Sequence, residues 1–137
     1  MFRHSKIFWG RLLVSGAKTI FKKYQLKRGV LVIDDTDKTR AKITSRIFKT
    51  HKIYNTKTSG YFNGQSIVFL LLVTNKISIP VGFKFYHPDP VLNNWEKNDK
   101  ELKKAGIVKK DRPARPKRDP KYPSKSQLSR ILVKEFK

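Results

Sequence analysis

The chain has 137 residues, no cysteine, and 32 Lys and Arg against 10 Asp and Glu, which gives a net charge of +22. This length suits one domain with a core of its own, and the lack of cysteine excludes disulfides, cysteine zinc sites and thiol nucleophiles. No apolar run approaches the roughly 18 residues that span a membrane, and the first residues do not read as a secretory signal. The charge predicts a polyanionic partner, chiefly nucleic acid, without separating DNA from RNA or anionic lipid.

The first 28 residues predict one basic amphipathic helix, from about residue 5 to residue 28. Apolar side chains recur on one face at helical spacing while lysines occupy the other face, and Gly29 is a typical helix end. Residues 30–33 are four consecutive strand formers. They predict a short strand that is covered on both faces.

Three acids follow this strand directly, and they are the only carboxylates in the first 88 residues: Asp34, Asp35 and Asp37. Carboxylates on a rigid element among basic residues are what a divalent metal needs to act on a phosphate backbone. Neighbouring side chains on a strand point to opposite faces, so only one of Asp34 and Asp35 would face the metals. The other interpretation is a turn, in which Asx side chains bond the nearby backbone, and the local pattern taken alone favours the turn.

The middle of the chain predicts a basic loop and then an antiparallel hairpin. Residues 38–64 contain no acid and read as a long loop with a short hairpin inside it. Residues 65–74 read as a buried strand, and residues 77–85 alternate apolar and polar positions, which predicts a second strand with one buried face. Pro80 cannot donate to a ladder, so this second strand should lie at an edge or carry a bulge.

The last third of the chain is charged and rich in proline. Residues 91–105 predict a short helix, residues 109–121 a stiff extended segment, and Ser124 caps a final helix whose apolar face would be left uncovered. We therefore divide the chain into four parts: 1–28, a basic helix; 29–90, the strand, the basic loop and the hairpin; 91–123, a charged, proline-rich insert or linker; and 124–137, a final helix.

Several of these segments together resemble the DDE transposases of bacterial insertion sequences, which have a ribonuclease-H-like core. The residues that carry the resemblance are Val30-Leu31-Val32-Ile33-Asp34-Asp35-Thr36, the basic loop from Lys38 to Lys52, Thr58 to Gln65, Ile79 to Tyr86, and Lys134-Glu135-Phe136. The resemblance covers most of the chain. It implies an α/β, partial ribonuclease-H-like fold that opens with the strand bearing the first acid, followed by two antiparallel strands. In that fold residues 29–90 would be the first part of the catalytic core, and residues 124–137 a core helix cut at the C-terminus.

The resemblance also implies a chemistry. Asp34, followed by Thr36, matches the family pattern best as the catalytic, metal-binding first acid, with Asp35 as the alternative register. Two Mg²⁺ ions would then assist the attack of water, and later of a 3′-hydroxyl, on DNA phosphodiesters. The implied partners are transposon-end DNA and other transposase subunits, in the bacterial cytoplasm near the nucleoid and away from any membrane.

Two acids of a DDE triad have no match. The family places the second Asp on a strand after a helix like residues 124–136, and the Glu on a later helix, so Glu135 is not the catalytic Glu. We therefore expect a truncated, N-terminal fragment of a transposase that is inactive in strand transfer by itself. The alternatives are a small basic nucleic-acid-binding protein without catalysis, and a non-functional remnant.

Two groups of basic residues are the candidates for DNA contacts: the loop that follows the acids, and a basic segment between residues 109 and 118 that could follow the DNA backbone. They are Lys38, Arg40, Lys42, Arg46, Lys49, Lys52, Lys109, Lys110, Arg112, Arg115, Lys117 and Arg118. For the loop residues, a solvated surface is an equally good interpretation. His4, His51 and His87 have no partner at ligand spacing, so we expect no histidine metal site.

Overall fold

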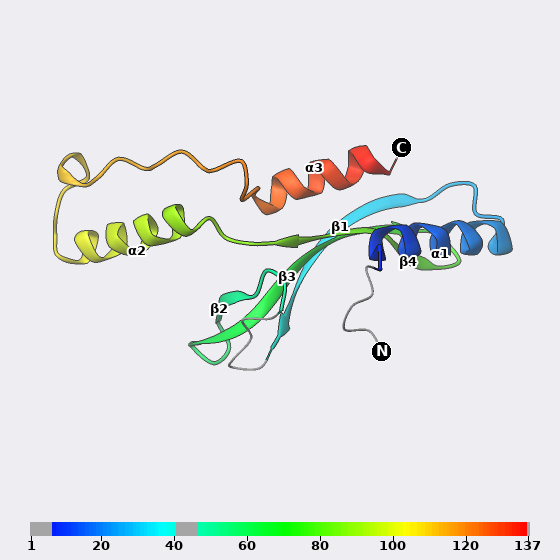
Figure 1. Cartoon of the computed structure of the whole chain (residues 1–137), viewed down its shortest axis with the longest axis horizontal. Coiled ribbons are helices and arrows are strands. Elements are labelled where there is room, and N and C mark those ends of the chain that lie inside the picture. Colours follow the sequence, from blue (N-terminus) through cyan, green and yellow to red (C-terminus); the bar gives the residue numbers. More distant parts are fainter. Residues whose placement is uncertain (1–6, 41–46, 137) are drawn as a thin grey trace.

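The computed structural model describes residues 7–40 and 47–136, which form an open antiparallel sheet and three helices. The helices are α1 (Trp9–Tyr24), α2 (Pro90–Lys104) and α3 (Lys125–Glu135), with a short 3₁₀ turn, η1, at Lys109–Asp111. The strands are β1 (Val30–Thr39), β2 (His51–Asn55), β3 (Gly60–Val73) and β4 (Ser78–Tyr86). The predicted α/β class is therefore confirmed. Figure 1 shows an elongated molecule, with α1 and α2 at opposite ends of the sheet.

Strand β3 is the centre of the sheet. β1 pairs with it along one edge, from Val30 opposite Val73 to Thr39 opposite Gly64. On the other edge, β2 pairs with the first part of β3 and β4 with the second part, so that β2 and β4 follow one another along the same edge. The hairpin expected from residues 65–85 is confirmed, and the basic loop contains a second hairpin, β2–β3.

Strand β4 carries the irregularity that Pro80 predicts. The pairing changes register between Leu70 and Leu71 of β3, so that Val81 is an extra residue between Pro80 and Gly82. The bulge turns the strand over, and Gly82 and Lys84 take the face on which strict alternation would have placed Phe83 and Phe85. The predicted single buried face is therefore wrong beyond Val81.

Strand β1 differs most from its prediction. It is ten residues long, it includes all three acids, and every one of its residues is exposed, from Leu31 at 37% to Val30 at 66% among the apolar ones. The expected cover on both faces is wrong, because β1 is an outer strand in the described part of the chain and α1 and α3 pack on β3 and β4 instead. The acids lie within the strand and not in a turn.

The core lies between the sheet and the two helices α1 and α3. Leu128 and Leu132 of α3 are buried against Val68 and Leu70 of β3, so the final apolar face is covered by the sheet, contrary to expectation. Helix α1 contributes the buried Ala17 and ends earlier than expected, at Gln25 in the left-handed conformation (φ 50°). Gly29 serves a different need, because a Cβ there would lie 2.7 Å from the Val73 carbonyl oxygen.

Candidate metal and nucleic-acid site

The three acids of β1 lie on two different faces of the sheet. Asp35 and Asp37 pair with Val68 and Ser66, on the face that α3 covers, whereas Asp34 pairs with Phe69 on the opposite face. The expectation that Asp34 and Asp35 point to opposite faces is therefore confirmed. The two candidates for the first DDE acid are now distinguished by their surroundings.

Asp35 forms an ion pair with a lysine, whereas Asp34 lies on the opposite face of the sheet from that lysine. The Asp35 carboxylate forms an ion pair with Lys125 Nζ, at the start of α3. Lys125 Nζ also lies 5.7 Å from the ring centroid of Tyr86, which holds the ammonium group over the sheet. The Asp34 carboxylate accepts a hydrogen bond of 2.8 Å from the backbone N–H of Asp35.

Asp37 belongs to a polar cluster that the sequence did not predict. Its carboxylate accepts a 2.5 Å hydrogen bond from the hydroxyl of Ser66, which is 3% exposed. The Ser66 oxygen lies 3.3 Å from His51 Nε2, and the His51 ring lies 5.6 Å from that of His87. The two histidines meet because β2 and β4 follow one another along the same edge of β3.

His87 sits in a poorly solvated position within this cluster. Burial lowers the pKa of His87 below its usual value, and the neighbouring His51 and Lys49 lower it further. Its Nδ1 atom is buried and makes no hydrogen bond within the described part of the chain. The His87 ring also lies beside that of Tyr122, at 5.7 Å between centroids. The cluster therefore packs the end of β4 against the segment before α3.

The candidate DNA-binding residues of the loop region do not form one surface. Lys38 lies on the face of Asp34, and Lys52 is exposed on β2. Arg40 instead donates a 2.8 Å hydrogen bond to Gln65, and Lys49 donates to the Phe85 carbonyl at 3.1 Å. These two have structural partners, while Lys42 and Arg46 lie outside the described residues.

The remaining candidates lie on an arm, by which we mean residues 89–123: α2 and the segment that returns beside it (Figure 1). Three of its arginines bind within the arm. Arg112 forms an ion pair of 2.8 Å with Asp99, and Arg115 one of 3.5 Å with Glu96. Arg118 donates to the Tyr122 carbonyl, whereas the lysines at 109, 110 and 117 are exposed.

A buried acid holds the base of the arm. Asp89 is 2% exposed, and one of its oxygens caps α2 by accepting from the backbone N–H groups of Val91 and Leu92. The other oxygen accepts a 2.9 Å hydrogen bond from the N–H of Asp119. This last bond is the largest cause of a pKa of Asp89 below its usual value.

The described residues do not fit a two-metal site. Among residues 7–40 and 47–136, no three His, Asp or Glu side chains are grouped so that they could hold a metal ion. Asp35 and Asp37 share a face, but Lys125 and Ser66 already bind them. A hard cation such as Mg²⁺ would need further oxygen ligands here.

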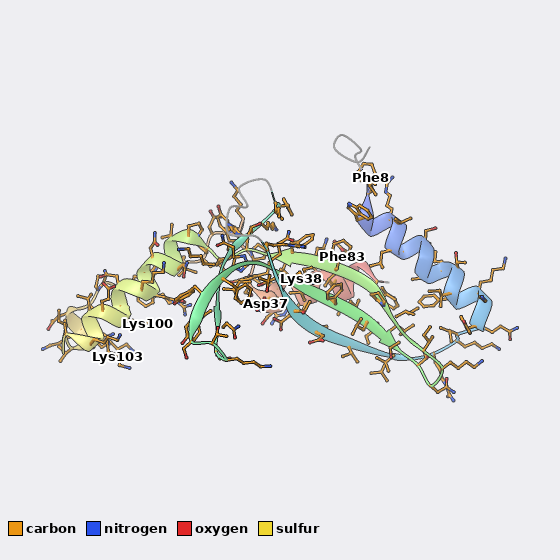
Figure 2. All side chains as sticks on the ribbon, turned by 90° about the horizontal axis from the view of Figure 1, so that it is seen from below. Phe8, Asp37, Lys38, Phe83, Lys100 and Lys103 are labelled. Atoms are coloured by element: carbon orange, nitrogen blue, oxygen red, sulfur yellow. The ribbon has the colours of Figure 1, made fainter. Side chains whose placement is uncertain are left out.

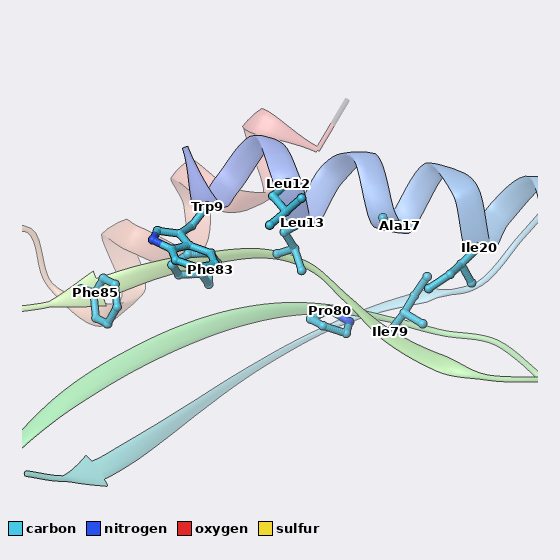
Figure 3. A pocket seen from close by; sticks show the side chains of 10 residues that line it. Trp9, Leu12, Leu13, Ala17, Ile20, Ile79, Pro80, Phe83 and Phe85 are labelled. Carbon is cyan, nitrogen blue, oxygen red and sulfur yellow. The ribbon is translucent and has the colours of Figure 1, made fainter. Parts of the chain in front are cut away.

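An apolar groove of about 550 Å³ separates α1 from β4 (Figure 3). Its walls include Trp9, Leu12 and Ile20 from the helix, with Pro80 and Phe83 from the strand. A binding site for a small polar substrate also places a few polar groups in such walls, and this lining has no charged side chain. The groove is therefore an apolar surface among the described residues.

Comparison with known proteins adds no family. No family model, no curated protein and no solved structure matches the chain. No helix in the described part is long and apolar enough to cross a membrane.

Proposed function

We propose that this chain is a DNA-binding part of the catalytic core of a DDE-type transposase, and that it binds DNA without cleaving it by itself. The observation that carries the proposal is how the charges are distributed. Lys and Arg outnumber Asp and Glu by 32 to 10, and several of the acids are occupied by partners within the chain, including Asp35, Asp89, Glu96 and Asp99. The charge left for an outside partner is strongly positive, which favours binding of a phosphate backbone.

The order of the strands supports the transposase part of the proposal. A strand bearing the acids, β1, pairs antiparallel with β3, and β3 pairs antiparallel with β4. That is the order which the resemblance implies for the opening of a ribonuclease-H-like core. Helix α3 then follows on the sheet and carries Glu135, which binds Lys84 at 2.8 Å and thus has a structural partner.

Within this proposal, Asp34 is the better first acid of the two. It lies on the face opposite Lys125, whereas the ammonium group of Lys125 neutralises Asp35. The described residues do not complete a Mg²⁺ site, so the proposal includes no catalytic step. DNA, with other transposase subunits in the bacterial cytoplasm, is the proposed partner.

Two experiments test the proposal. First, fluorescence anisotropy with a short labelled DNA duplex should show binding by the purified chain, and the labelled strand should stay intact when Mg²⁺ is added. Second, the DNA that follows the codon of Lys137, read in all frames, should encode a strand ending in Asp and later a helix bearing Glu. Failure to bind the duplex would exclude a DNA-binding role, and absence of both acids downstream would exclude the transposase.

A second candidate, a small nucleic-acid-binding protein without catalytic ancestry, is favoured by one observation. Asp35 and Asp37 both have structural partners, Lys125 and Ser66, as stabilising acids in an ordinary sheet would have. This candidate also binds nucleic acid, so the anisotropy measurement does not separate the two. The downstream DNA does, because only a transposase needs the second Asp and the Glu.

A further inference from the structure

The arm has the features of a preformed surface for the DNA backbone, and this inference rests on the proposed function. Four contacts join α2 and its N-cap Asp89 to the segment that returns beside it, and their partners run overall in the opposite direction along the chain. The pairs are Asp89 with Asp119, Trp95 with Pro113, Glu96 with Arg115, and Asp99 with Arg112. The prolines at 113, 116 and 120 further limit the backbone of the returning segment.

These contacts pair acids of α2 with arginines of the returning segment. Glu96 and Asp99 face the returning segment and bind its arginines, while Asp89 is buried at the base. Asp119 accepts a 2.8 Å hydrogen bond from the backbone N–H of Lys121 and is held in a local turn. The arm has six acids, and four of them have these partners. Among the described residues, the carboxylates of the other two, Glu101 and Asp111, have no ion pair and accept no such hydrogen bond.

The lysines remain on the outside. Eight exposed lysines cover the arm: Lys97, Lys100, Lys103, Lys104, Lys109, Lys110, Lys117 and Lys121. Figure 2 shows Lys100 and Lys103 near the end of the arm that lies away from the sheet. Four of the eight lie on α2 and are not among the candidates predicted from the sequence. Nothing local in the sequence indicates that Glu96 and Asp99 face the returning segment.

The size of the arm also fits a duplex. A helix of 15 residues such as α2 is about 22 Å long, a length over which B-DNA presents about 13 phosphates. This count includes both strands on all sides of the duplex, so fewer phosphates face one surface, and the eight lysines together can neutralise several of those. Because the arm is already ordered by its internal contacts, binding would lose less conformational entropy than binding by a free tail.

We propose that the outer lysines of this arm are the chain's main contact with the DNA phosphate backbone, and that the arm's arginines serve to build the arm. The partner is duplex DNA, recognised by its charge and not by its base sequence.

The test compares two variants that lose the same charge. One replaces Lys97, Lys100, Lys103 and Lys104 of α2 by Gln; the other replaces Lys18, Lys22, Lys23 and Lys27, which are exposed on and just after α1. Gln has nearly the helix propensity of Lys, so both helices should persist, as circular dichroism would verify. Binding to a labelled duplex is measured at several salt concentrations.

The arm variant should bind at least about tenfold more weakly at low salt, and its slope of log K against log [salt] should fall by about 2 to 4. The α1 variant should change both quantities much less. Equal losses in the two variants would mean that net charge alone matters and would overturn the proposal. So would an arm variant that binds the duplex like the original chain, whether or not it loses binding to phosphatidylserine vesicles. If the original chain binds no duplex, the proposed function itself fails.

Discussion

Asp35 of β1 and Lys125 of α3 form an ion pair although 90 residues separate them along the chain. The pair connects the outer strand to the last helix, and Lys125 also lies over the ring of Tyr86. Asp35 therefore has a lysine as counter-ion on the face that α3 covers, whereas Asp34 lies on the opposite face. The same contact makes Asp35 a stabilising residue with a counter-ion of its own.

Replacing Asp35 by Asn should therefore lower the free energy of unfolding slightly. Both partners are about half exposed, so the expected loss is about 0.2–1 kcal/mol and should shrink at high salt. Urea denaturation at two salt concentrations measures it. Asp34→Asn is the matched control and should change stability less, because Asp34 has no such ion pair among the described residues. A larger loss for Asp34→Asn would contradict this assignment.

Leu132 should contribute far more to stability than its neighbour. It is 3% exposed and packs from α3 onto the sheet, with a methyl group 3.1 Å from the position of a Cβ at Gly82. Leu132→Ala should lower the free energy of unfolding by about 2–5 kcal/mol. Ile131→Ala, at a site 38% exposed, should lower it clearly less. Equal effects in urea denaturation would show that α3 does not dock by this face.

Stability should fall in mild acid because of His87. Its pKa is lower in the folded chain than its usual value of about 6.5, so the unfolded chain takes up the proton first. The contribution of the neutral ring is complete above that value and is lost as the pH falls from it towards the folded pKa. His87→Phe keeps an aromatic ring beside His51 and Tyr122 and should flatten the pH dependence in this range. An unchanged pH dependence in the variant would mean that another group titrates there.

Asp89→Asn should detach the returning segment while leaving the start of α2 in place. The Asn side chain keeps one oxygen, which can still accept from Val91 and Leu92, but its amide group cannot accept from the N–H of Asp119. Hydrogen exchange followed by NMR should show that the variant exchanges the Asp119 amide faster than the original chain does, while exchange at Leu92 changes little. Asp111→Asn, in the exposed turn η1, is the control and should alter neither amide.

The same buried acid predicts a second effect of pH on the arm. The pKa of Asp89 is lowered, so its contribution is present above the usual value near 3.8 and disappears as the pH falls through the folded pKa. In the original chain, acid pH should therefore speed hydrogen exchange of the arm's amides. In Asp89→Asn, which has no titrating group at this position, the same fall in pH should change their exchange less.

Much of the fold could be predicted from local pattern. The β3–β4 hairpin, the bulge or edge at Pro80 and the Ser124 cap depend on neighbouring residues, and the structure confirms all three. The exposure of Val30 to Ile33 could not be predicted, because an apolar run indicates a strand without indicating what packs on it. Helix α1 ends before the predicted position because Gln25, and not Gly29, adopts the left-handed conformation that ends it.

The site was harder to predict because its contacts are distant in sequence. Asp35 with Lys125, and His51 with His87, meet only through the pairing of strands and the docking of α3. The arginines at 112 and 115 were assigned to DNA because nothing local shows that α2 would supply Asp99 and Glu96 as partners. The spacing of these acids at three residues, on one helical face, was the signal that could have indicated it.

The central claim is that the chain binds DNA through its positive charge, and the most direct test is the salt dependence of that binding. If the chain makes about six to ten phosphate contacts, raising the salt concentration from about 50 to 200 mM should lower its affinity for a DNA duplex by a factor of about 10³–10⁵. A steep, linear fall of log K against log [salt] is the predicted result. An affinity that is absent at low salt, or that does not change with salt, would contradict the account.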